Sequence, residues 1–343
     1  MKNDISELKH TPKSSLLDLK LYLANIYSGY RETCLLKAAI DDGVFDLLKE
    51  PHTVEEISKV TGKNELIVST LCRALEKRGL LDIQDGKYID SLKSTEFLTS
   101  SSEFSLLPRV RFNLAMLEDW ADLPERLNKG PIVDSEKNIY GINWMSAIES
   151  DRRAEGIPKM IDVIADNVDI ASLRKVLELG PGHGLHLIGL CGINSNIQPY
   201  ILDRPGMIDF TKANMQSYGI TPVAMAGDYR TDDFGGGYDL VMTMFNSAGS
   251  DPEMCGKIAK SIVVGGHLFV RRAVSTSTPG FLSDVDEALR HPEGSELHYY
   301  PTDDEMRSRG RTYDDRMSDY GFRVKDRRRM DTISEVIMYE RIQ

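Results

Sequence analysis

A glycine-rich stretch in the second half of the chain, Glu178-Leu-Gly-Pro-Gly-His-Gly184, constrains the fold most. It follows an apolar run at 175–179 and precedes a helical pattern at 184–192, so it is predicted to join a strand to a helix. Glycine adopts backbone conformations that other residues avoid, which allows a tight turn and the close approach of a ligand. Ligands of α/β sheets bind at the carboxyl ends of the strands, which is where this turn is expected to lie.

From residue 171 onward, short apolar runs alternate with helical segments. This alternation predicts an α/β fold with a doubly wound, Rossmann-like parallel sheet and helices on both faces. The last two runs, 322–325 and 335–340, have only a short connection, which favours a terminal antiparallel hairpin. The other expected strands are 175–179, 198–202, 221–225, 238–245 and 267–271, and the expected helices are 184–192, 206–218 and 252–263.

The first 100 residues are predicted to be mainly helical and to end in a hairpin. Thr53 and Glu56 match a capping box at the start of one helix, and Asp85-Gly86 is a strong signal for a hairpin turn. A helix-turn-helix followed by a two-stranded wing indicates a winged-helix domain. The expected helices are 14–28, 32–40, 44–49, 54–60 and 65–78, and the expected strands are 80–83 and 87–89.

Winged-helix domains usually bind DNA, which would make nucleic acid the ordinary partner of such a domain. The chain has a formal net charge of −11 and no basic stripe on its candidate recognition helix, so nucleic acid is disfavoured. The apolar side chains between Leu16 and Ile26 exceed a single stripe, so a second chain is expected to cover them. We therefore favour a homodimer formed through this domain, with a ligand-sensing regulator as the alternative.

Residues 101–170 are expected to form a helical connector between the winged-helix domain, 1–100, and the α/β domain, 171–343. The connector is rich in large apolar side chains, and its last helix, 143–167, is interrupted near Pro158. A connector between two domains can line a binding pocket. The residues expected to contact a substrate there are Phe112, Asn113, Met116 and Trp120.

Acidic side chains lie at the ends of three successive predicted strands. Glu178 precedes the glycine stretch, and Asp203 ends the second strand, where an acid can accept both hydroxyls of a ribose. Asp228 follows the third strand, where it can accept from an adenine amino group while Tyr229 stacks on the ring. Together the three acids predict a site for an adenosine-containing cofactor.

The identity of that cofactor depends on the order of the glycines and on Glu178. A dinucleotide fingerprint reads G-x-G-x-x-G, whereas this chain has G-x-G-x-G with Leu185 at the third position. A carboxylate repels a pyrophosphate and attracts an ammonium group, and S-adenosylmethionine carries both an ammonium and a sulfonium. S-adenosylmethionine is therefore the expected cofactor, and a nicotinamide-dependent dehydrogenase is disfavoured.

The stretch Glu178–Gly184 resembles the first motif of class I S-adenosylmethionine-dependent methyltransferases. Nearly the whole chain is similar to the small-molecule O-methyltransferases related to the caffeate and hydroxyindole enzymes. Further matches are Val44–Leu48, Arg73–Leu81, Gly265-Gly266 and Tyr320–Phe322. The resemblance implies an enzyme that dimerises through its first domain and methylates a small, aromatic or apolar acceptor. It also implies cofactor contacts at Glu178, Gly180, Gly182, Asp203, Asp228 and Tyr229, to which we add Asn246.

The chain departs from this family after the fourth strand, where the family usually carries His-Asp-Trp and the histidine is the general base. Here the stretch is Met244–Glu253, which contains no histidine, and neither Asn246 nor Ser247 can deprotonate a phenol at neutral pH. Either another residue acts as the base, or the acceptor is a sulfur, nitrogen or carbon atom that needs none. The candidate bases are His291, His298 and Glu293.

The remaining features indicate structural roles. The four cysteines are scattered and no metal-ligand spacing occurs, so we expect reduced thiols and no metal. His183 and His186 are expected to have no direct role. No apolar run is long enough for a membrane helix and the start of the chain is polar, so a cytoplasmic location is expected.

Overall fold

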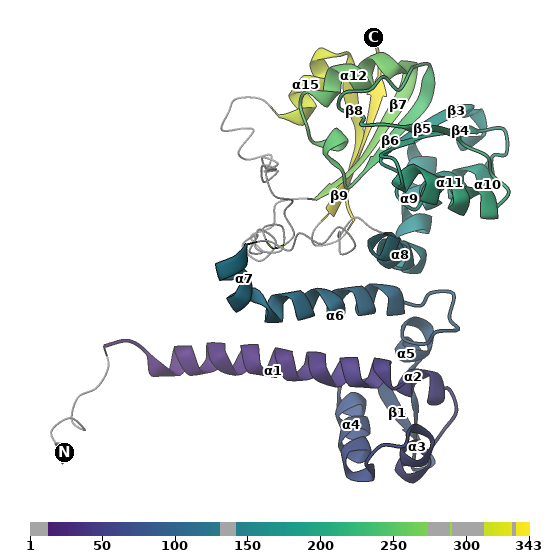
Figure 1. The fold of residues 1–343 in the computed structure, drawn as a ribbon. Coiled ribbons are helices and arrows are strands. Elements are labelled where there is room, and N and C mark those ends of the chain that lie inside the picture. The colour runs from purple at the N-terminus through teal and green to yellow at the C-terminus, as the bar shows by residue number, and fades with distance from the viewer. Residues whose placement is uncertain (1–12, 131–141, 274–288, 290–311, 331–333) are drawn as a thin grey trace. The chain divides into compact units, whose positions relative to one another are not determined.

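The computed structural model describes residues 13–130, 142–273, 289, 312–330 and 334–343 (Figure 1). The chain divides into two compact units, Met1–Leu107 and Pro108–Gln343. Most of the segment expected to be a separate connector, 101–170, therefore belongs to the same unit as the sheet.

The first unit contains a helix-turn-helix followed by a two-stranded hairpin, as the sequence predicts. Thr53 accepts from the backbone N–H of Glu56 and the Glu56 side chain accepts from the Thr53 N–H, which confirms the capping box. The hairpin turns at Asp85 and Gly86, which both have positive φ. The elements are α1 (Leu16–Asp41), α2 (Val44–Leu47), α3 (Val54–Thr61), α4 (Glu65–Lys77), β1 (Leu81–Gln84), β2 (Lys87–Asp90) and α5 (Leu92–Phe97).

The first helix differs from the prediction, because α1 is one continuous helix where two were expected. Ser28 and Gly29 have low helix propensity, but one glycine costs only about 1 kcal/mol inside a helix. The Thr33 hydroxyl donates to the Gly29 carbonyl at 2.9 Å, one turn earlier, which spans the position of the expected break.

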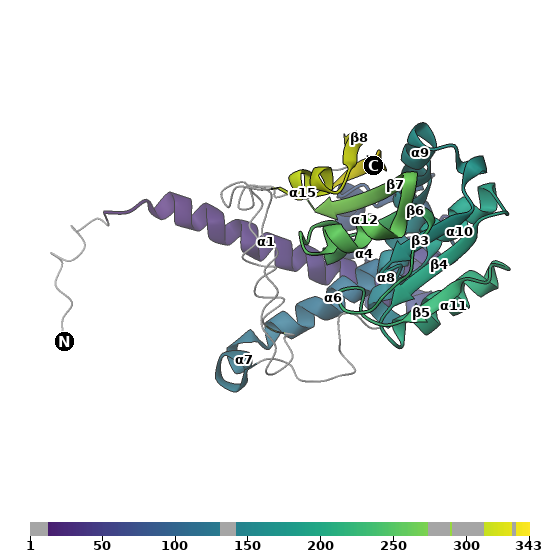
Figure 2. The same ribbon diagram turned by 90° about the horizontal axis from the view of Figure 1, so that it is seen from above.

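The second unit contains a seven-stranded sheet in the order β5-β4-β3-β6-β7-β9-β8 (Figures 1 and 2). β5, β4, β3, β6 and β7 pair in parallel, while β9 pairs antiparallel with both β7 and β8. The strands are β3 (Lys175–Leu179), β4 (Gln198–Asp203), β5 (Val223–Ala226), β6 (Tyr238–Met244), β7 (Ile262–Ala273), β8 (Phe322–Arg329) and β9 (Ser334–Arg341). This topology confirms the predicted doubly wound sheet and its terminal antiparallel hairpin.

Helices cover both faces of the sheet (Figures 1 and 2). On one face, side chains of α9, α10 and α11 pack with alternate strand residues such as Val176, Ile201 and Met242. On the other face, α12 and α15 pack on Leu177 and Val241. The helical segments are α6 (Leu107–Ala121), α7 (Leu123–Lys129), α8 (Ile142–Asp151), the π-helix η3 (Arg152–Gly156), α9 (Ile157–Asn167), the 3-10 helix η4 (Ile170–Ser172), α10 (Leu185–Ile193), α11 (Met207–Ser217), the 3-10 helix η5 (Ser247–Gly249), α12 (Met254–Ser261) and α15 (Tyr313–Asp319).

Candidate functional site

The glycine stretch forms a loop between β3 and α10 in which three residues take a left-handed backbone. The φ angles are +61° at Gly180, +55° at Gly182 and +73° at Gly184. Side chains are strained in this region, so the loop requires glycine at each position. A Cβ at Gly184 would lie 3.0 Å from Thr211 Cγ2, and one at Gly182 would lie 3.0 Å from Met145 Sδ. Both conformation and packing therefore explain the spacing of the glycines.

Glu178 lies inside the sheet unit, and its side chain has no exposed surface. Strand alternation places it on the face of β3 that α10 covers, between Ile201 of β4 and Met242 of β6, which are also fully buried. Its Oε1 atom lies 2.9 Å from His186 Nδ1. Burial, reinforced by the negative charge of Asp203, holds the pKa of Glu178 well above its usual range. The proposed contact between Glu178 and a cofactor thus involves a deeply buried carboxyl group.

Both histidines of this region are buried, with 4% of His183 and 3% of His186 exposed. His183 Nδ1 accepts from the backbone N–H of Leu185 at 3.0 Å, in the first turn of α10. The two rings lie 5.2 Å apart. Burial lowers the pKa of His183 well below its ordinary value and that of His186 to about 3, so both rings are neutral at pH 7. Neither histidine was expected to have a direct role, and the contact between His186 and Glu178 was not predicted.

Asp203 ends β4 beside the glycine loop. Its Oδ1 atom accepts from the backbone N–H of Arg204 at 2.8 Å, and Oδ2 lies 3.5 Å from the Gly182 nitrogen. Burial raises the pKa of Asp203, while these two backbone N–H groups oppose that shift. The structure therefore brings Asp203 next to the loop, as the order of strands predicts.

Asp228 and Tyr229 follow β5, as expected. Asp228 is exposed, and its Oδ1 atom accepts from the Arg230 N–H at 2.8 Å. The Tyr229 hydroxyl lies 2.8 Å from the hydroxyl oxygen of Ser247, which also accepts from the Arg230 guanidinium at 3.1 Å. Ser247 is buried and holds the segments after β5 and β6 together, a role that the sequence analysis did not predict.

Asn246 links the ends of β6 and β3. Its side-chain N–H donates to the Leu179 carbonyl at 2.7 Å, and its Oδ1 atom accepts from the Ala248 N–H at 3.0 Å. The Asn246 Nδ2 atom would also lie 3.0 Å from a Cβ at Gly180. Asn246 therefore packs directly on the glycine loop, and its contact with a cofactor stays a prediction.

Phe245, at the carboxyl end of β6, combines a strained backbone with two cationic neighbours. Its φ angle of +51° is unusual for a non-glycine residue. The guanidinium groups of Arg152 and Arg271 lie 4.8 and 4.7 Å from the ring centroid. These three residues come from η3, the end of β6 and β7, so no local sequence pattern could have predicted their contact.

The other predicted site residues have different outcomes. His291, His298 and Glu293 lie outside the described residues, so their proposed role as bases stays a prediction. Four residues proposed to contact substrate, Phe112, Asn113, Met116 and Trp120, lie on α6. Asn113 is exposed and the other three are partly buried.

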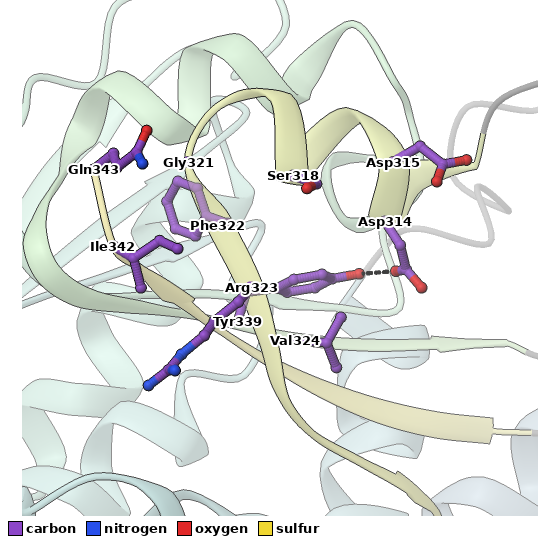
Figure 3. Close-up of a pocket in the computed structure, with 10 residues that line it drawn as sticks. All are labelled: Asp314, Asp315, Ser318, Gly321, Phe322, Arg323, Val324, Tyr339, Ile342 and Gln343. Atoms are coloured by element: carbon purple, nitrogen blue, oxygen red, sulfur yellow. Dashed lines mark hydrogen bonds between the residues drawn. The ribbon is translucent and has the colours of Figure 1, made fainter.

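A groove of about 490 Å³ lies at the other end of the sheet (Figure 3). It is lined by the first residues of β8, by Tyr339 of β9, by the two residues after β9 and by residues of α15. Among the α15 residues is Asp314, whose Oδ1 atom accepts from the Tyr339 hydroxyl at 2.5 Å. Phe322 pairs with Arg341 here, near the amino end of β7. The groove is therefore not part of the site formed at the carboxyl ends of the parallel strands.

Within the described ranges, no group of three or more His, Cys, Asp and Glu side chains could hold a metal ion. The helices in those ranges also include none that is long and apolar enough to cross a membrane.

No protein-family model matches the chain. Among curated proteins, an uncharacterized protein of Methanocaldococcus jannaschii is 24% identical over 296 residues, 84% of this chain and 79% of that protein. The L-tyrosine C(3)-methyltransferase of Streptomyces lavendulae is 22% identical over 90% of this chain and 88% of that enzyme. The 3-hydroxy-5-methyl-1-naphthoate 3-O-methyltransferase of Streptomyces sahachiroi is 22% identical over 64% of this chain and 66% of that enzyme.

Solved structures resemble the chain over nearly its full length. An O-methyltransferase family protein from Burkholderia thailandensis has a TM-score of 0.72 and 20% identity, covering 96% of this chain and 99% of that one. Human N-acetylserotonin methyltransferase, solved in complex with S-adenosylmethionine, has a TM-score of 0.68 and 18% identity, with 97% and 100% covered. An N,N-dimethyltransferase acting on 8-amino-8-demethyl-D-riboflavin, from Streptomyces davawensis, has a TM-score of 0.59 and 18% identity, with 95% and 99% covered. The chain therefore has the fold of the small-molecule O-methyltransferase family, which includes the human enzyme solved with S-adenosylmethionine.

Proposed function

We propose that this protein is a methyltransferase that binds S-adenosylmethionine and methylates a small molecule, at an oxygen atom of an aromatic or apolar acceptor. The observation that carries the proposal is the loop with left-handed glycines at positions 180, 182 and 184, beside Asp203 at the end of the neighbouring strand. The fold shared with methyltransferases over nearly the whole chain supports it.

The residues at this edge of the sheet fit the chemistry of the cofactor. Without Cβ atoms, Gly180 and Gly182 expose backbone that a ligand can approach. Asp203 offers carboxylate oxygens to ribose hydroxyls, and Asp228 with Tyr229 would hold the adenine. Glu178 carries an oxygen, Oε2, that is buried and has no hydrogen-bond partner among the residues described. The ammonium group of S-adenosylmethionine would satisfy this acceptor, whereas an ionised phosphate has no proton to donate to it.

When bound, the cofactor supplies a methyl group that its sulfonium has already activated. The protein must then align the acceptor with this methyl group and exclude water. We propose that Phe112, Met116 and Trp120 of α6 contribute to binding the acceptor, with Asn113 as a polar contact.

The atom that receives the methyl group depends on a base. Asn246 and Ser247, after β6, already bond to backbone and to Tyr229, and neither side chain is basic. For an oxygen acceptor we propose His291, His298 or Glu293 as the base. Similar proteins named above methylate oxygen, carbon and nitrogen, so an acceptor that needs no base is the alternative.

Calorimetric titration with S-adenosylhomocysteine tests the cofactor site. We expect saturable binding that Asp203→Ala weakens by roughly ten- to a hundredfold, because a hydrogen bond to a charged group contributes about 1.5–3 kcal/mol. Asp162→Ala removes an exposed acid from α9 and serves as the matched control, with affinity expected within about twofold of the unmodified protein. Absence of saturable binding, or equal affinities of the two variants, would contradict the proposal.

We also propose that two copies of the chain associate through the first unit. Apolar side chains of α1 are widely exposed, including Leu17 at 64%, Leu21 at 57% and Tyr30 at 72%. Exposed apolar surface on this scale is typical of an interface. A second copy is the occupant that we favour, because the resemblance to dimerising methyltransferases extends through this unit.

A further inference from the structure

The buried contact between Glu178 and His186 joins the sheet to the helix that follows the glycine loop. Glu178 lies in β3, two residues before Gly180, and His186 lies in the first turn of α10. Their atoms Oε1 and Nδ1 are 2.9 Å apart, which is a hydrogen-bond distance. The side chains are 0% and 4% exposed, respectively. The pair therefore lies beneath the loop that we propose binds the cofactor, within an apolar layer.

Each member of the pair has a second polar atom that the contact leaves unused. Glu178 Oε2 and His186 Nε2 are both buried, and neither has a hydrogen-bond partner among residues 13–130, 142–273, 289, 312–330 and 334–343. Buried polar atoms are almost always paired in folded proteins, because leaving one unpaired costs free energy. An unpaired carboxyl oxygen two residues from a ligand-binding loop indicates that the ligand supplies its partner.

We propose that His186 is a positioning residue. It holds Glu178 Oε1 so that Oε2 accepts from the ammonium group of the cofactor. The pair of side chains releases one proton when this cation binds. This inference rests on the proposed function and names the group of the cofactor that the pair recognises.

Charged side chains from β4, η3 and β7, together with the ring of His183 in the glycine loop, influence the pKa values of the pair. Burial and the negative charge of Asp203, from β4, together hold the pKa of Glu178 well above its usual range. Burial lowers the pKa of His186 to about 3, and the positive charges of Arg152, from η3, and Arg271, from β7, act in the same direction.

His183 and Arg153 complete this environment. Burial lowers the pKa of His183, and the positive charges of Arg152 and Arg153 contribute to this shift. A neutral His183 adds no charge beside the pair. At neutral pH the ligand-free site therefore holds a neutral Glu178 carboxyl group and a neutral His186 ring. The carboxyl O–H at Oε1 donates to His186 Nδ1.

Binding of a cation reverses this preference, because a positive charge near a carboxyl group favours its ionised form. The proton between Oε1 and Nδ1 then stays on Nδ1, and the proton on Nε2 passes to the solvent. Glu178 becomes a carboxylate, with Oε1 accepting from His186 and Oε2 accepting from the ammonium group. Two protons on the pair become one, and no electrons are transferred.

Titration calorimetry with S-adenosylhomocysteine, which carries the same ammonium group, measures this proton directly. Titrations in two buffers of different ionisation enthalpy, repeated from pH 6 to pH 8, give the number of protons released. We expect about one proton per ligand for the unmodified protein, and a Kd that falls up to tenfold for each unit of pH, roughly the limit for one proton.

Three variants separate the positioning role from a structural one. Glu178→Gln keeps the shape but cannot ionise, so proton release is lost and the Kd becomes independent of pH. His186→Leu removes the contact to Oε1 and is expected to weaken binding more than about tenfold. His186→Asn places an amide near the position of Nδ1 and is expected to restore most of the affinity.

Asp90→Asn is the matched control, since Asp90 is a buried acid of the first unit whose pKa burial raises to about 7. Its replacement is expected to leave the proton count of binding unchanged. Ligand binding without proton release, or equal affinity of the His186→Leu variant and the unmodified protein, would overturn the inference. If His186→Leu does not fold, the inference is tested by comparing the number of protons released by the unmodified protein, expected to be about one, with the number released by Glu178→Gln, expected to be zero. No binding by the unmodified protein would instead contradict the proposed function.

Discussion

Asp90, the last residue of β2, is an acid held in an environment that suits its neutral form. It is 7% exposed, and neither carboxylate oxygen has a hydrogen-bond partner in the part of the chain that the structure describes. Burial raises its pKa to about 7, Asp46 adds to the shift and Lys49 opposes it. Because the pKa is higher in the folded state, this group stabilises the fold below about pH 4, and the contribution is lost as the pH rises through about 7.

The Asp90→Asn variant should therefore gain stability relative to the unmodified protein as the pH rises. The amide cannot ionise, so it avoids the cost of burying a charge at pH 8, whereas at pH 5 the buried Asp90 carboxyl group of the folded protein is still neutral. We expect the difference in unfolding free energy to change by at most about 1.4 kcal/mol per pH unit. Scanning calorimetry at pH 5 and pH 8 measures it, and a difference that does not vary with pH would refute the prediction.

Two glycines at opposite ends of α10 should respond in opposite ways to alanine. Gly184 has a φ of +73° and close contacts to Thr211 and Met215, so Gly184→Ala should destabilise the protein by about 1–2 kcal/mol and weaken ligand binding. Gly192 lies in the helix, and a Cβ added there would meet nothing within 4 Å, so Gly192→Ala should stabilise the protein by about 0.5–1 kcal/mol. Urea unfolding of both variants makes the comparison, and equal stabilities would show that the loop is not constrained as described.

Individual site residues were predictable where their position along a strand determines their place. Asp203 and Asp228 follow strands whose apolar runs are visible in the sequence, so their location at one edge of the sheet follows from the topology. The contact between Glu178 and His186 was not predictable, because it depends on how α10 is rotated against β3. The stack on Phe245 was missed for a similar reason, since its two arginines come from distant segments.

At the scale of elements, the order of the strands and helices was predicted more accurately than the lengths of the strands. The order of strands and helices follows from alternating runs that only a doubly wound sheet can bury. β7 is longer than expected, extending over Ile262–Ala273 instead of 267–271. Gly265 and Gly266 suggested a break before this strand. Instead the chain continues through Gly265 at a φ of +82°, and the register of β7 against β6 shifts between Tyr238 and Leu240.

In the segment 143–167 a helix with an interruption was predicted correctly, but the position and kind of the interruption differ from the prediction. The expected helix 143–167 with an interruption near Pro158 becomes α8, the π-helix η3 and α9, with Pro158 in the first turn of α9. Proline is tolerated there because its missing N–H would have no partner within the helix. The interruption comes earlier, as a π-helix that carries Arg152 toward Phe245.

For the whole molecule, association through α1 is the property most open to test. Leu17 and Leu21 are four residues apart on one side of the helix and more than half exposed. We expect the unmodified chain to sediment as a dimer and the Leu17→Glu, Leu21→Glu double variant as a monomer, since charged side chains would be buried without partners. Leu127→Glu, on α7 and 80% exposed, is the control and should remain a dimer. A monomeric unmodified chain, or a dimeric double variant, would contradict the proposed interface.

The two edges of the sheet have a consequence for the behaviour of the protein at high concentration. One edge strand, β5, has only four residues. The other, β8, carries five lysine and arginine side chains, and its register shifts between Val324 and Asp326. Short, charged or irregular edges do not readily pair with strands of another molecule. The C-terminal hairpin thus covers the long apolar strand β7 and protects the folded chain from aggregation through its own sheet.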